Sequence, residues 1–327
     1  MQLSDFNYEL PKEFIAQKPV SPRDNSRLMV LNSKIEHKKF FEITDYLKSE
    51  DVLVINETKV IHAKLTGEKE TGAVVELIAT RTDGNRCRCM IKATNPRIGN
   101  KLIFGKHKAK VVGIEKDEFI VEFDSDAIKL MNDIGELPTP PYVKRKLDND
   151  SQYQTVYSRK KGSFAAPTAG LHFTEELLEK IKRKNVKIAK VCLHVGFGTF
   201  LPVKDIKTHK MHEEYFEIDR ENADIINNRK GRLIAVGTTS VRVLESAADE
   251  NGKIIAKKGK TDIFIYPGYR FKTKIDAMLT NFHLPKSTLL MLVSAFIGRE
   301  KLLNAYKEAI KEKYRFFSFG DAMLILK

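Results

Sequence analysis

The stretch from about Lys59 to Asp124 constrains the fold of this 327-residue chain more than any other part of it. Apolar and polar residues alternate there in short runs, such as "AVVELIAT", "RCRCMIKA" and "EFIVEF", which are separated by Gly, Asn and Asp. Alternation with a period of two, in short runs joined by turns, is typical of a small antiparallel barrel or sandwich. We predict a barrel that ends at a cluster of prolines, Pro138, Pro140 and Pro141, where regular structure is forbidden.

Before this stretch the sequence indicates a hairpin-like pair and a buried strand, "DVLVINE", and from Tyr153 onward strands and helices alternate. "VKIAKVCLHV", "RLIAVG" and "TDIFIYPG" are predicted strands, whereas "TEELLEKIKRKN" and "TSVRVLESAADE" are predicted helices, the first capped by Thr174. Such alternation indicates an α/β unit. The sequence therefore predicts an α/β fold in which a discontinuous larger domain, residues 1–57 and 151–327, carries an inserted small antiparallel β-barrel domain, residues 58–150.

Cysteine usage and hydropathy exclude several classes of protein. The N-terminal "MQLSDFNYELPKEF" lacks a signal-peptide pattern, and the longest apolar run, "TLLMLVSAFIG", is too short to span a bilayer, so we predict a cytoplasmic protein. The three cysteines, Cys87, Cys89 and Cys192, form no C-x-x-C pair and have no histidines at zinc spacing. We predict buried thiols with no disulfide and no metal.

The charge balance indicates a polyanionic partner. Lys and Arg number 57 against 43 acids, which gives a net charge of +14, and basic residues concentrate between Arg81 and Lys110. Nucleic acid is the obvious partner for such a chain. The alternative is that a lysine-rich composition only solvates the surface, since acids also cluster in "EKDEFIVEFDSD".

Four segments rich in Gly, Thr and Ser lie between predicted strands and helices, where α/β proteins bind ligands. They are "GSFAAPTAGLHFT", "LHVGFGTFLPV", "AVGTTSVRVLES" and "TNFHLPKSTLLM", and three of them contain a histidine: His172, His194 and His283. Each histidine alone fits a satisfied core residue, and the glycines and hydroxyls fit turns and helix caps. Three together favour a site, because imidazole transfers protons near neutral pH.

A carboxylate is a further candidate base. "MHEEYFEI" offers Glu213 or Glu214, although a solvated turn explains this pair equally well. The chain has no phosphate-binding P-loop, no Rossmann glycine fingerprint and no H-E-x-x-H motif. The residues alone therefore indicate a metal-free α/β enzyme with a basic β-insert, and they leave the reaction open.

Several long motifs together resemble one family. "AAPTAGLHFT", "LHVGFGTF", "MHEEYFEI", "AVGTTSVRVLES", "LTNFHLPKSTLLMLVSAF" and "YRFFSFGDAMLI" occur in the order seen in the S-adenosylmethionine:tRNA ribosyltransferase-isomerase family of queuosine biosynthesis (QueA). The resemblance covers essentially the whole chain and is densest from Tyr153 to Leu326.

This resemblance implies a reaction and its substrates. S-adenosyl-L-methionine would be the ribosyl donor, and tRNA carrying 7-aminomethyl-7-deazaguanine in its anticodon would be the acceptor. The ribosyl group would be transferred and isomerised to give epoxyqueuosine-tRNA, with release of adenine and methionine. No metal and no membrane would be involved, and the predicted protein is a monomer.

The resemblance also implies roles for particular residues. The candidate proton-transfer residues are His172, which we rank slightly ahead, His283, His194 and Glu213. The candidate donor-binding residues are Thr168, Gly170, Gly196, Gly198, Thr199, Thr238, Thr239, Ser240 and Arg242. The candidate tRNA-binding residues are Arg86, Arg88, Lys92, Lys182 and Arg183.

Two other functions remain open at this point. A non-catalytic RNA-binding protein would explain the positive charge and the β-insert, but it would not explain the hydroxyl-rich loops of the α/β part. An α/β enzyme acting on a small anionic metabolite would explain those loops, but it would not explain the basic residues of the insert.

Overall fold

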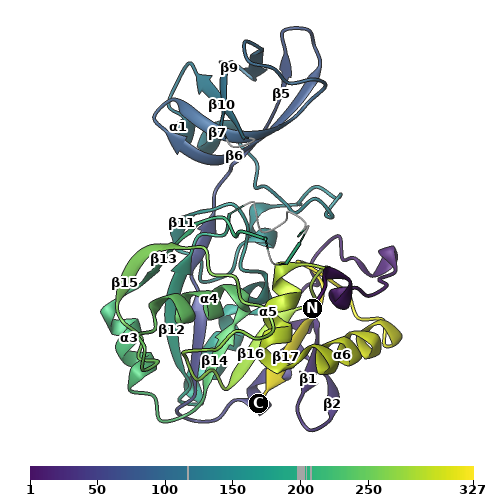
Figure 1. Ribbon diagram of the computed structural model, residues 1–327, viewed down its shortest axis with the longest axis vertical. Helices are drawn as coiled ribbons and strands as arrows, with labels where there is room; N and C mark the ends of the chain where they lie inside the picture. The colour runs from purple at the N-terminus through teal and green to yellow at the C-terminus, as the bar shows by residue number, and fades with distance from the viewer. Residues whose placement is uncertain (116–117, 197–202, 204, 207) are drawn as a thin grey trace. The chain divides into compact units, whose positions relative to one another are not determined.

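The computed structural model describes residues 1–115, 118–196, 203, 205–206 and 208–327. It divides into two compact units, Met1–Lys59 with Pro140–Lys327, and Val60–Thr139 (Figure 1). The first unit is therefore made from two separate stretches of the chain, and the second lies between them in the sequence.

A nine-stranded mixed sheet forms the centre of the larger unit, with strand order β15-β13-β12-β3-β14-β16-β17-β1-β2. Strands β12, β3, β14 and β16 run parallel to one another, whereas β13 is antiparallel to β12 and β17 is antiparallel to β16. The strands span β1 Arg27–Leu31, β2 Ile35–Lys39, β3 Val52–Asn56, β12 Lys187–Leu193, β13 Glu214–Ile218, β14 Leu233–Val236, β15 Lys257–Thr261, β16 Ala277–Asn281 and β17 Ala322–Leu326. A separate two-stranded ribbon joins β4 Thr58–Val60 to β11 Lys160–Ser163.

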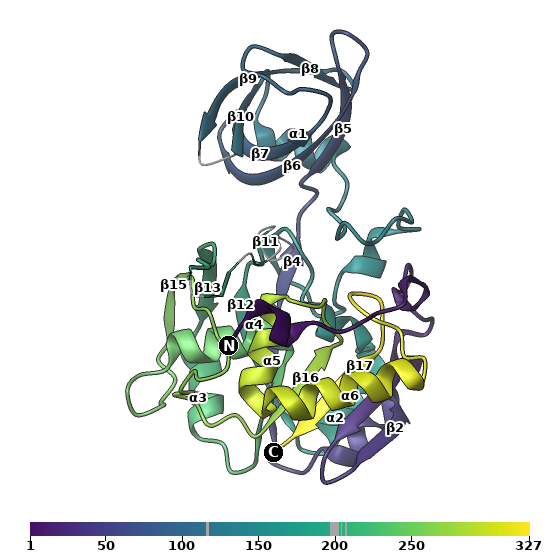
Figure 2. The same ribbon diagram turned by 45° about the vertical axis from the view of Figure 1, so that its right-hand side comes forward.

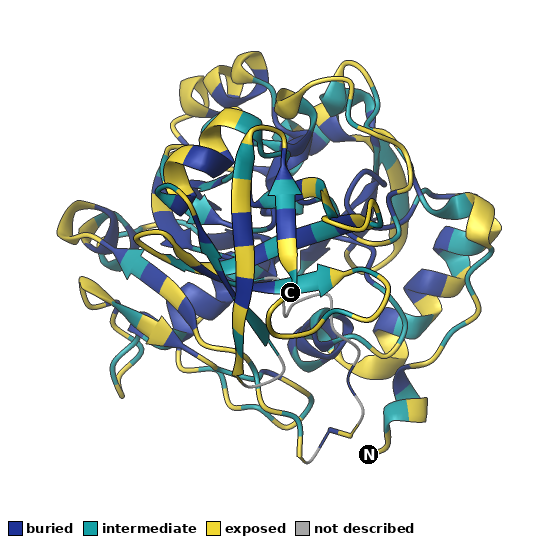
Figure 3. Ribbon diagram, turned by 90° about the horizontal axis from the view of Figure 1, so that it is seen from above, coloured by how far each residue is buried: buried dark blue, intermediate teal, exposed yellow. Residues whose placement is uncertain are grey.

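Both faces of the sheet are covered, because successive strand residues point to opposite sides. In β3, Val52 and Val54 belong to one buried cluster with residues of the last four helices, and Leu53 and Ile55 belong to a second cluster with α2. Helices α2, α3 and α6 carry both buried and exposed residues, whereas every residue of α4 and α5 is buried or half-buried (Figure 3). They span α2 Glu175–Arg183, α3 Arg220–Asn227, α4 Gly237–Ala247, α5 Thr288–Ile297 and α6 Arg299–Lys311.

Helix starts follow the local sequence. The side chains of Thr174, Asp219 and Ser287 each accept a hydrogen bond from a backbone N–H in the first turn of α2, α3 and α5 respectively. Such caps satisfy donors that a helix start otherwise leaves unpaired. Six short 3-10 helices complete the described part of the chain: η1 Leu3–Phe6, η2 Lys12–Phe14, η3 Arg23–Asn25, η4 Phe40–Tyr46, η5 Asp150–Tyr153 and η6 Thr168–His172.

The smaller unit is a closed antiparallel barrel with strand order β10-β7-β6-β5-β8-β9 (Figure 2). Its strands span β5 Lys64–Lys69, β6 Val74–Asp83, β7 Arg86–Lys92, β8 Lys101–Phe104, β9 His107–Glu115 and β10 Glu118–Phe123, and α1 covers Ala127–Ile134. In β7, Cys87 and Cys89 are buried inside while Arg86 and Arg88 point outward. The predicted fold class, an α/β fold with an inserted antiparallel barrel, is confirmed.

One predicted strand is wrong. "TDIFIYPG" was expected to be a strand, but β15 ends at Thr261 and the residues after it are irregular. The preceding residues Lys257–Thr261 pair with β13 instead. Ile265 is nevertheless buried in the core of the larger unit, so the apolar run marks burial of an irregular segment and not a strand.

Candidate active site

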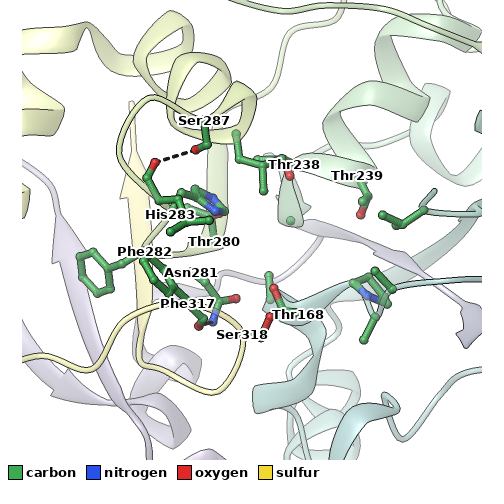
Figure 4. Close-up of a pocket in the computed structure, with 18 of the residues that line it drawn as sticks. Thr168, Thr238, Thr239, Thr280, Asn281, Phe282, His283, Ser287, Phe317 and Ser318 are labelled. Atoms are coloured by element: carbon green, nitrogen blue, oxygen red, sulfur yellow. Dashed lines mark hydrogen bonds between the residues drawn. The ribbon is translucent and has the colours of Figure 1, made fainter. Parts of the chain in front are cut away.

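One pocket of the larger unit lies at the carboxyl ends of the parallel strands β14 and β16, where open α/β sheets bind ligands. It spans about 740 Å³ of unfilled space, part of it open to solvent. Residues that precede β17 reach the same edge because β17 runs antiparallel to β16. Small, hydroxyl and aromatic side chains line it: Tyr142, Tyr153, Ala165, Ala166, Pro167, Thr168, Ala169, Val195, Gly237, Thr238, Thr239, Thr280, Asn281, Phe282, His283, Leu284, Ser287, Leu289, Phe317 and Ser318 (Figure 4).

The start of α4 forms one wall of the pocket. Gly237 has φ of +82°, a left-handed conformation that favours glycine, and Thr238 and Thr239 follow it along the wall. The Thr239 hydroxyl oxygen is buried and has no hydrogen-bond partner among the described residues. Ser240, in contrast, donates to the Val236 carbonyl at 2.7 Å, so its hydroxyl is used within the helix.

The segment around η6 forms another wall. Thr168 lines the pocket together with the small residues Ala165, Ala166 and Ala169. Gly170 does not line it. A β-carbon at Gly170 would collide with the hydroxyl of Tyr157, so this glycine is needed for close packing behind the wall.

His283 is the one predicted proton-transfer residue that lines the pocket. Its Nε2 lies 2.7 Å from the Thr280 hydroxyl, and its backbone N–H donates to the Tyr306 hydroxyl at 2.8 Å. Burial lowers the pKa of His283 to about 3. The ring is therefore neutral at physiological pH, and its position is set by contacts from strand β16 and helix α6.

His172 lies behind the pocket wall, not in it. It is buried, its ring stacks on Phe40, and its Nδ1 lies 2.7 Å from the Ser26 hydroxyl. Its Nε2 lies 3.2 Å from the amide nitrogen of Asn281, which does line the pocket. Burial lowers the pKa of His172 to about 4. Both ring nitrogens are thus engaged with other side chains.

His194 lies outside the pocket as well. Its Nδ1 is 2.7 Å from the Thr58 hydroxyl, and its ring stacks on Tyr215. A β-carbon at Gly162 would come within 2.7 Å of the imidazole, so this glycine lets the ring pack against backbone. Burial lowers the pKa of His194.

The two neighbouring glutamates of "MHEEYFEI" differ sharply. Glu213 is exposed and pairs with Lys260 at 2.9 Å. Glu214 is buried, forms an ion pair with the buried Arg242, and accepts the Gly196 N–H at 2.7 Å. The carboxylate held at a fixed position is therefore Glu214.

Arg242 itself does not line the pocket. It points from α4 toward Glu214, and its Nε and second terminal nitrogen are buried without a hydrogen-bond partner among the described residues. The predicted donor-binding residues Gly198 and Thr199 lie outside the residues that the structure describes.

Comparison with known proteins adds the decisive observation. The family model described as "Queuosine biosynthesis protein" matches residues 3–325, almost the whole chain. The chain belongs to this family. It is similar to S-adenosylmethionine:tRNA ribosyltransferase-isomerases from Acetivibrio thermocellus, at 53% identity, and Thermoanaerobacter sp. (strain X514), at 52% identity. The first alignment covers 99% of this chain and all of the relative, and the second covers both chains completely.

A solved structure of the queuosine biosynthesis family agrees. The crystal structure of an S-adenosylmethionine tRNA ribosyltransferase from Thermotoga maritima has a TM-score of 0.58 and 40% identity, and covers 99% of this chain and 100% of its own. The predicted family and its ribosyltransferase-isomerase activity in queuosine biosynthesis are therefore confirmed. The roles of individual residues stay predictions.

The predicted tRNA-binding residues of the barrel all have acidic neighbours. Arg86 pairs with Glu122 at 2.7 Å, Arg88 pairs with Glu115, and Lys92 lies 3.3 Å from Glu76. Neighbouring carboxylates cancel part of the positive potential of strand β7.

The two predicted residues of α2 lie at its exposed last turn. Lys182 pairs with Glu179 at 2.7 Å, and Arg183 is exposed. All three cysteines are free and buried. Among the described residues no group of three or more His, Cys, Asp or Glu is placed to hold a metal ion, and no helix there is long and apolar enough to cross a membrane.

The sequence did not predict two polar residues that the structure places on the pocket wall, Asn281 and Ser318. Asn281 was passed over beside His283 in "TNFH", although a polar side chain at the last position of a buried apolar strand is a usable signal. Ser318 lies on the pocket wall, 2.8 Å from the Tyr142 hydroxyl; it stands within the motif "YRFFSFGDAMLI", but nothing in that motif singles out this serine.

Proposed function

We propose that the pocket at the ends of β14 and β16 binds S-adenosyl-L-methionine as ribosyl donor. The acceptor is the aminomethyl group of 7-aminomethyl-7-deazaguanine in a tRNA anticodon, and the product is epoxyqueuosine-tRNA with release of adenine and methionine. The observation that best supports this proposal is the position of the pocket at the strand ends, in a chain about half identical to S-adenosylmethionine:tRNA ribosyltransferase-isomerases.

The donor has groups that match the walls of the pocket. Its carboxylate suits the start of α4, where the first backbone N–H groups lack helical partners and the Thr238 and Thr239 hydroxyls lie close by. Its flat base suits the apolar and aromatic wall formed by Pro167, Tyr153 and Phe317. Small residues around Thr168 let the ligand approach the backbone.

The proposed chemistry needs a group that accepts a proton. The sulfonium of the donor makes the adjacent ribose carbon acidic, so a neutral base beside it suffices and no bound metal is required. We assign this task to His283, because it is the one candidate proton-transfer residue whose side chain lines the pocket. His283→Ala is expected to abolish turnover while tRNA affinity stays within about twofold, since no phosphate contact is lost.

The tRNA is proposed to contact basic residues of the chain. The overall charge of +14 supports this, and the exposed side chains of Arg86 and Lys92 on the barrel and of Lys182 and Arg183 on α2 are candidates. Replacing Arg86, Arg88 and Lys92 together is expected to weaken tRNA binding and flatten its salt dependence, by about one unit of log–log slope per lost phosphate contact. A Lys101→Ala variant on strand β8 is the matched control. An unaltered slope would place the phosphate contacts elsewhere.

The first test is single-turnover release of adenine from S-adenosyl-L-methionine, with and without tRNA carrying the 7-aminomethyl-7-deazaguanine. Release that requires this tRNA supports the proposal. Release without RNA indicates an enzyme acting on a small metabolite, and no release in either case indicates an RNA-binding protein. We further propose an active monomer in the cytoplasm, where tRNA is modified. Activity that appears only above a dimerisation concentration would contradict the monomer.

A further inference from the structure

A row of hydrogen-bonded side chains leads from behind the pocket to its wall. Ser26, His172 and Asn281 are all buried, and they come from three separate parts of the chain. The Ser26 hydroxyl is 2.7 Å from His172 Nδ1, and His172 Nε2 is 3.2 Å from the Asn281 amide nitrogen. That nitrogen also lies 3.1 Å from the Phe317 carbonyl oxygen.

These contacts decide which way the Asn281 amide points. The Phe317 carbonyl can only accept a hydrogen bond, so the atom of Asn281 beside it must be the donating nitrogen. The same nitrogen donates to His172 Nε2, which must therefore be unprotonated. The proton of the neutral ring then lies on Nδ1 and is donated to the Ser26 hydroxyl oxygen.

The amide oxygen of Asn281 is left without a donor. It is buried and has no hydrogen-bond partner among the described residues, on a residue that is only 2% exposed. Asn281 lies on the pocket wall with Ser318 and faces the side of the pocket that carries Thr168 (Figure 4). A buried acceptor without a donor is unfavourable, so a ligand that supplies a donor there gains affinity and specificity.

We propose that the Asn281 amide oxygen accepts a hydrogen bond from the exocyclic amino group of the adenine of the donor substrate. His172 is a positioning residue that holds this amide in the accepting orientation. The proposal rests on the proposed function for its ligand, S-adenosyl-L-methionine.

The surroundings of Asn281 favour adenine over the other donor groups of the ligand. Pro167, Tyr153 and Phe317 supply an apolar and aromatic wall for a flat base. The methionine ammonium would favour a carboxylate, and none of the described residues that line the pocket is Asp or Glu. Hydroxyls can donate as well as accept, so the pocket's Thr and Ser residues suit the ribose and the ring nitrogens.

The first test changes the ligand and leaves the protein intact. The full chain with its tRNA is given S-adenosyl-L-methionine, or the counterpart that carries hydrogen in place of the exocyclic amino group. Wild-type kcat/KM is expected to fall about tenfold to a hundredfold for the counterpart, because a buried acceptor loses its donor. An unchanged kcat/KM would overturn the proposal, whereas failure to release adenine from the normal donor would overturn the proposed function instead.

The second test removes the acceptor. Asn281→Leu and Asn281→Ser are expected to lower kcat/KM for the normal donor and to treat the two donors equally, within about twofold. The exposed Glu250→Gln is the control and keeps the wild-type discrimination. Discrimination that persists in a folded Asn281 variant would show that another group reads the base.

The third test separates positioning by His172 from proton transfer. In His172→Gln the new amide oxygen can take the place of Nε2 and accept from Asn281, whereas His172→Leu cannot. We expect KM for the donor to rise about tenfold in His172→Leu and to return close to the wild-type value in His172→Gln. The single-turnover rate at saturating donor is expected to change less than about threefold in both variants. A loss of 10²-fold or more at saturation in both variants would make His172 a general base.

Discussion

Loss of the Glu214 charge should reveal how tightly the Arg242–Glu214 pair is coupled to the stability of the larger unit. Both side chains are almost fully buried, with about 5% and 3% of each exposed. Glu214→Gln keeps the shape of the side chain and an oxygen for the Gly196 N–H, but it leaves the Arg242 charge buried without its counterion.

The expected cost follows from this burial. Removing one partner of a buried ion pair lowers the free energy of unfolding by about 3–5 kcal/mol. This is several-fold more than the loss when one partner of an exposed pair is removed. Among the described residues no other contact compensates, because the Nε and the second terminal nitrogen of Arg242 lack hydrogen-bond partners there. For a unit of this size that loss lowers Tm by roughly 6–20 °C.

A double-mutant cycle measures the coupling. Urea unfolding followed by circular dichroism is carried out on Glu214→Gln, Arg242→Met and the double variant, with equal m-values as the condition for comparison. We expect the double variant to be more stable than either single variant and a coupling free energy of about 2 kcal/mol or more. Additivity within about 0.5 kcal/mol would refute the reasoning, since it would mean that the two charges do not sense each other.

The remaining predictions concern acid stability, close packing and a helix cap. Burial lowers the pKa of His172 to about 4 from its ordinary value of 6.5, so the unfolded chain binds a proton that the folded chain refuses between these values. The associated stability is fully present above pH 6.5 and is lost as the pH falls toward 4; the loss already reaches about 2 kcal/mol at pH 5. His172→Gln should therefore lose less stability than wild type between pH 7 and pH 5 in urea titrations, and an equal loss would contradict this. Gly67→Ala places a β-carbon against the Ile103 carbonyl and the Phe104 ring, so it should destabilise the barrel. Gly72→Ala, at a turn with φ of +79° and open space around it, bears only backbone strain of about 1 kcal/mol and should cost less. Thermal unfolding of the two variants checks the order, and equal losses would contradict it. Thr174→Ala removes the side-chain oxygen that accepts the Leu177 N–H and should lower the free energy of unfolding by about 1 kcal/mol. Thr174→Ser keeps a hydroxyl at this position and should retain most of that stability.

Local sequence patterns correctly predicted much of the fold. The alternation in "RCRCMIKA" predicted a strand with Cys87 and Cys89 inside and Arg86 and Arg88 outside, and this is what strand β7 shows. The strand predicted for "TDIFIYPG" was wrong because local pattern does not determine which residues pair with a neighbouring strand. Its apolar residues are buried, but pairing with β13 is taken by Lys257–Thr261, and only the neighbouring strand could decide that register.

The candidate site was predictable as a set of segments and not as a set of roles. Gly-, Thr- and Ser-rich loops at strand ends led to Thr168, Thr238, Thr239 and His283, which the structure brings together. The same reasoning gave His172 a place in the pocket, whereas its ring lies behind the wall. A loop pattern does not state which way a side chain points.

Glu213 and Glu214 show the same limit at a single step along the chain. Glu213 precedes strand β13 and is exposed beside Lys260, whereas Glu214, the first residue of β13, is buried against Arg242. The residues alone could not say which, because the choice depends on the side of β13 that α4 covers.

The sequence by itself determined the α/β class, the inserted barrel, the helix caps and the family, because these depend on local periodicity, turn chemistry and long motifs. Only the tertiary structure decided that Asn281 lies on the pocket wall with an amide oxygen that has no partner among the described residues, in an orientation set by His172 and Ser26. Those three residues are more than a hundred positions apart in the chain, and a hydrogen bond is set by distances of a few ångström that only packing of the whole unit can fix.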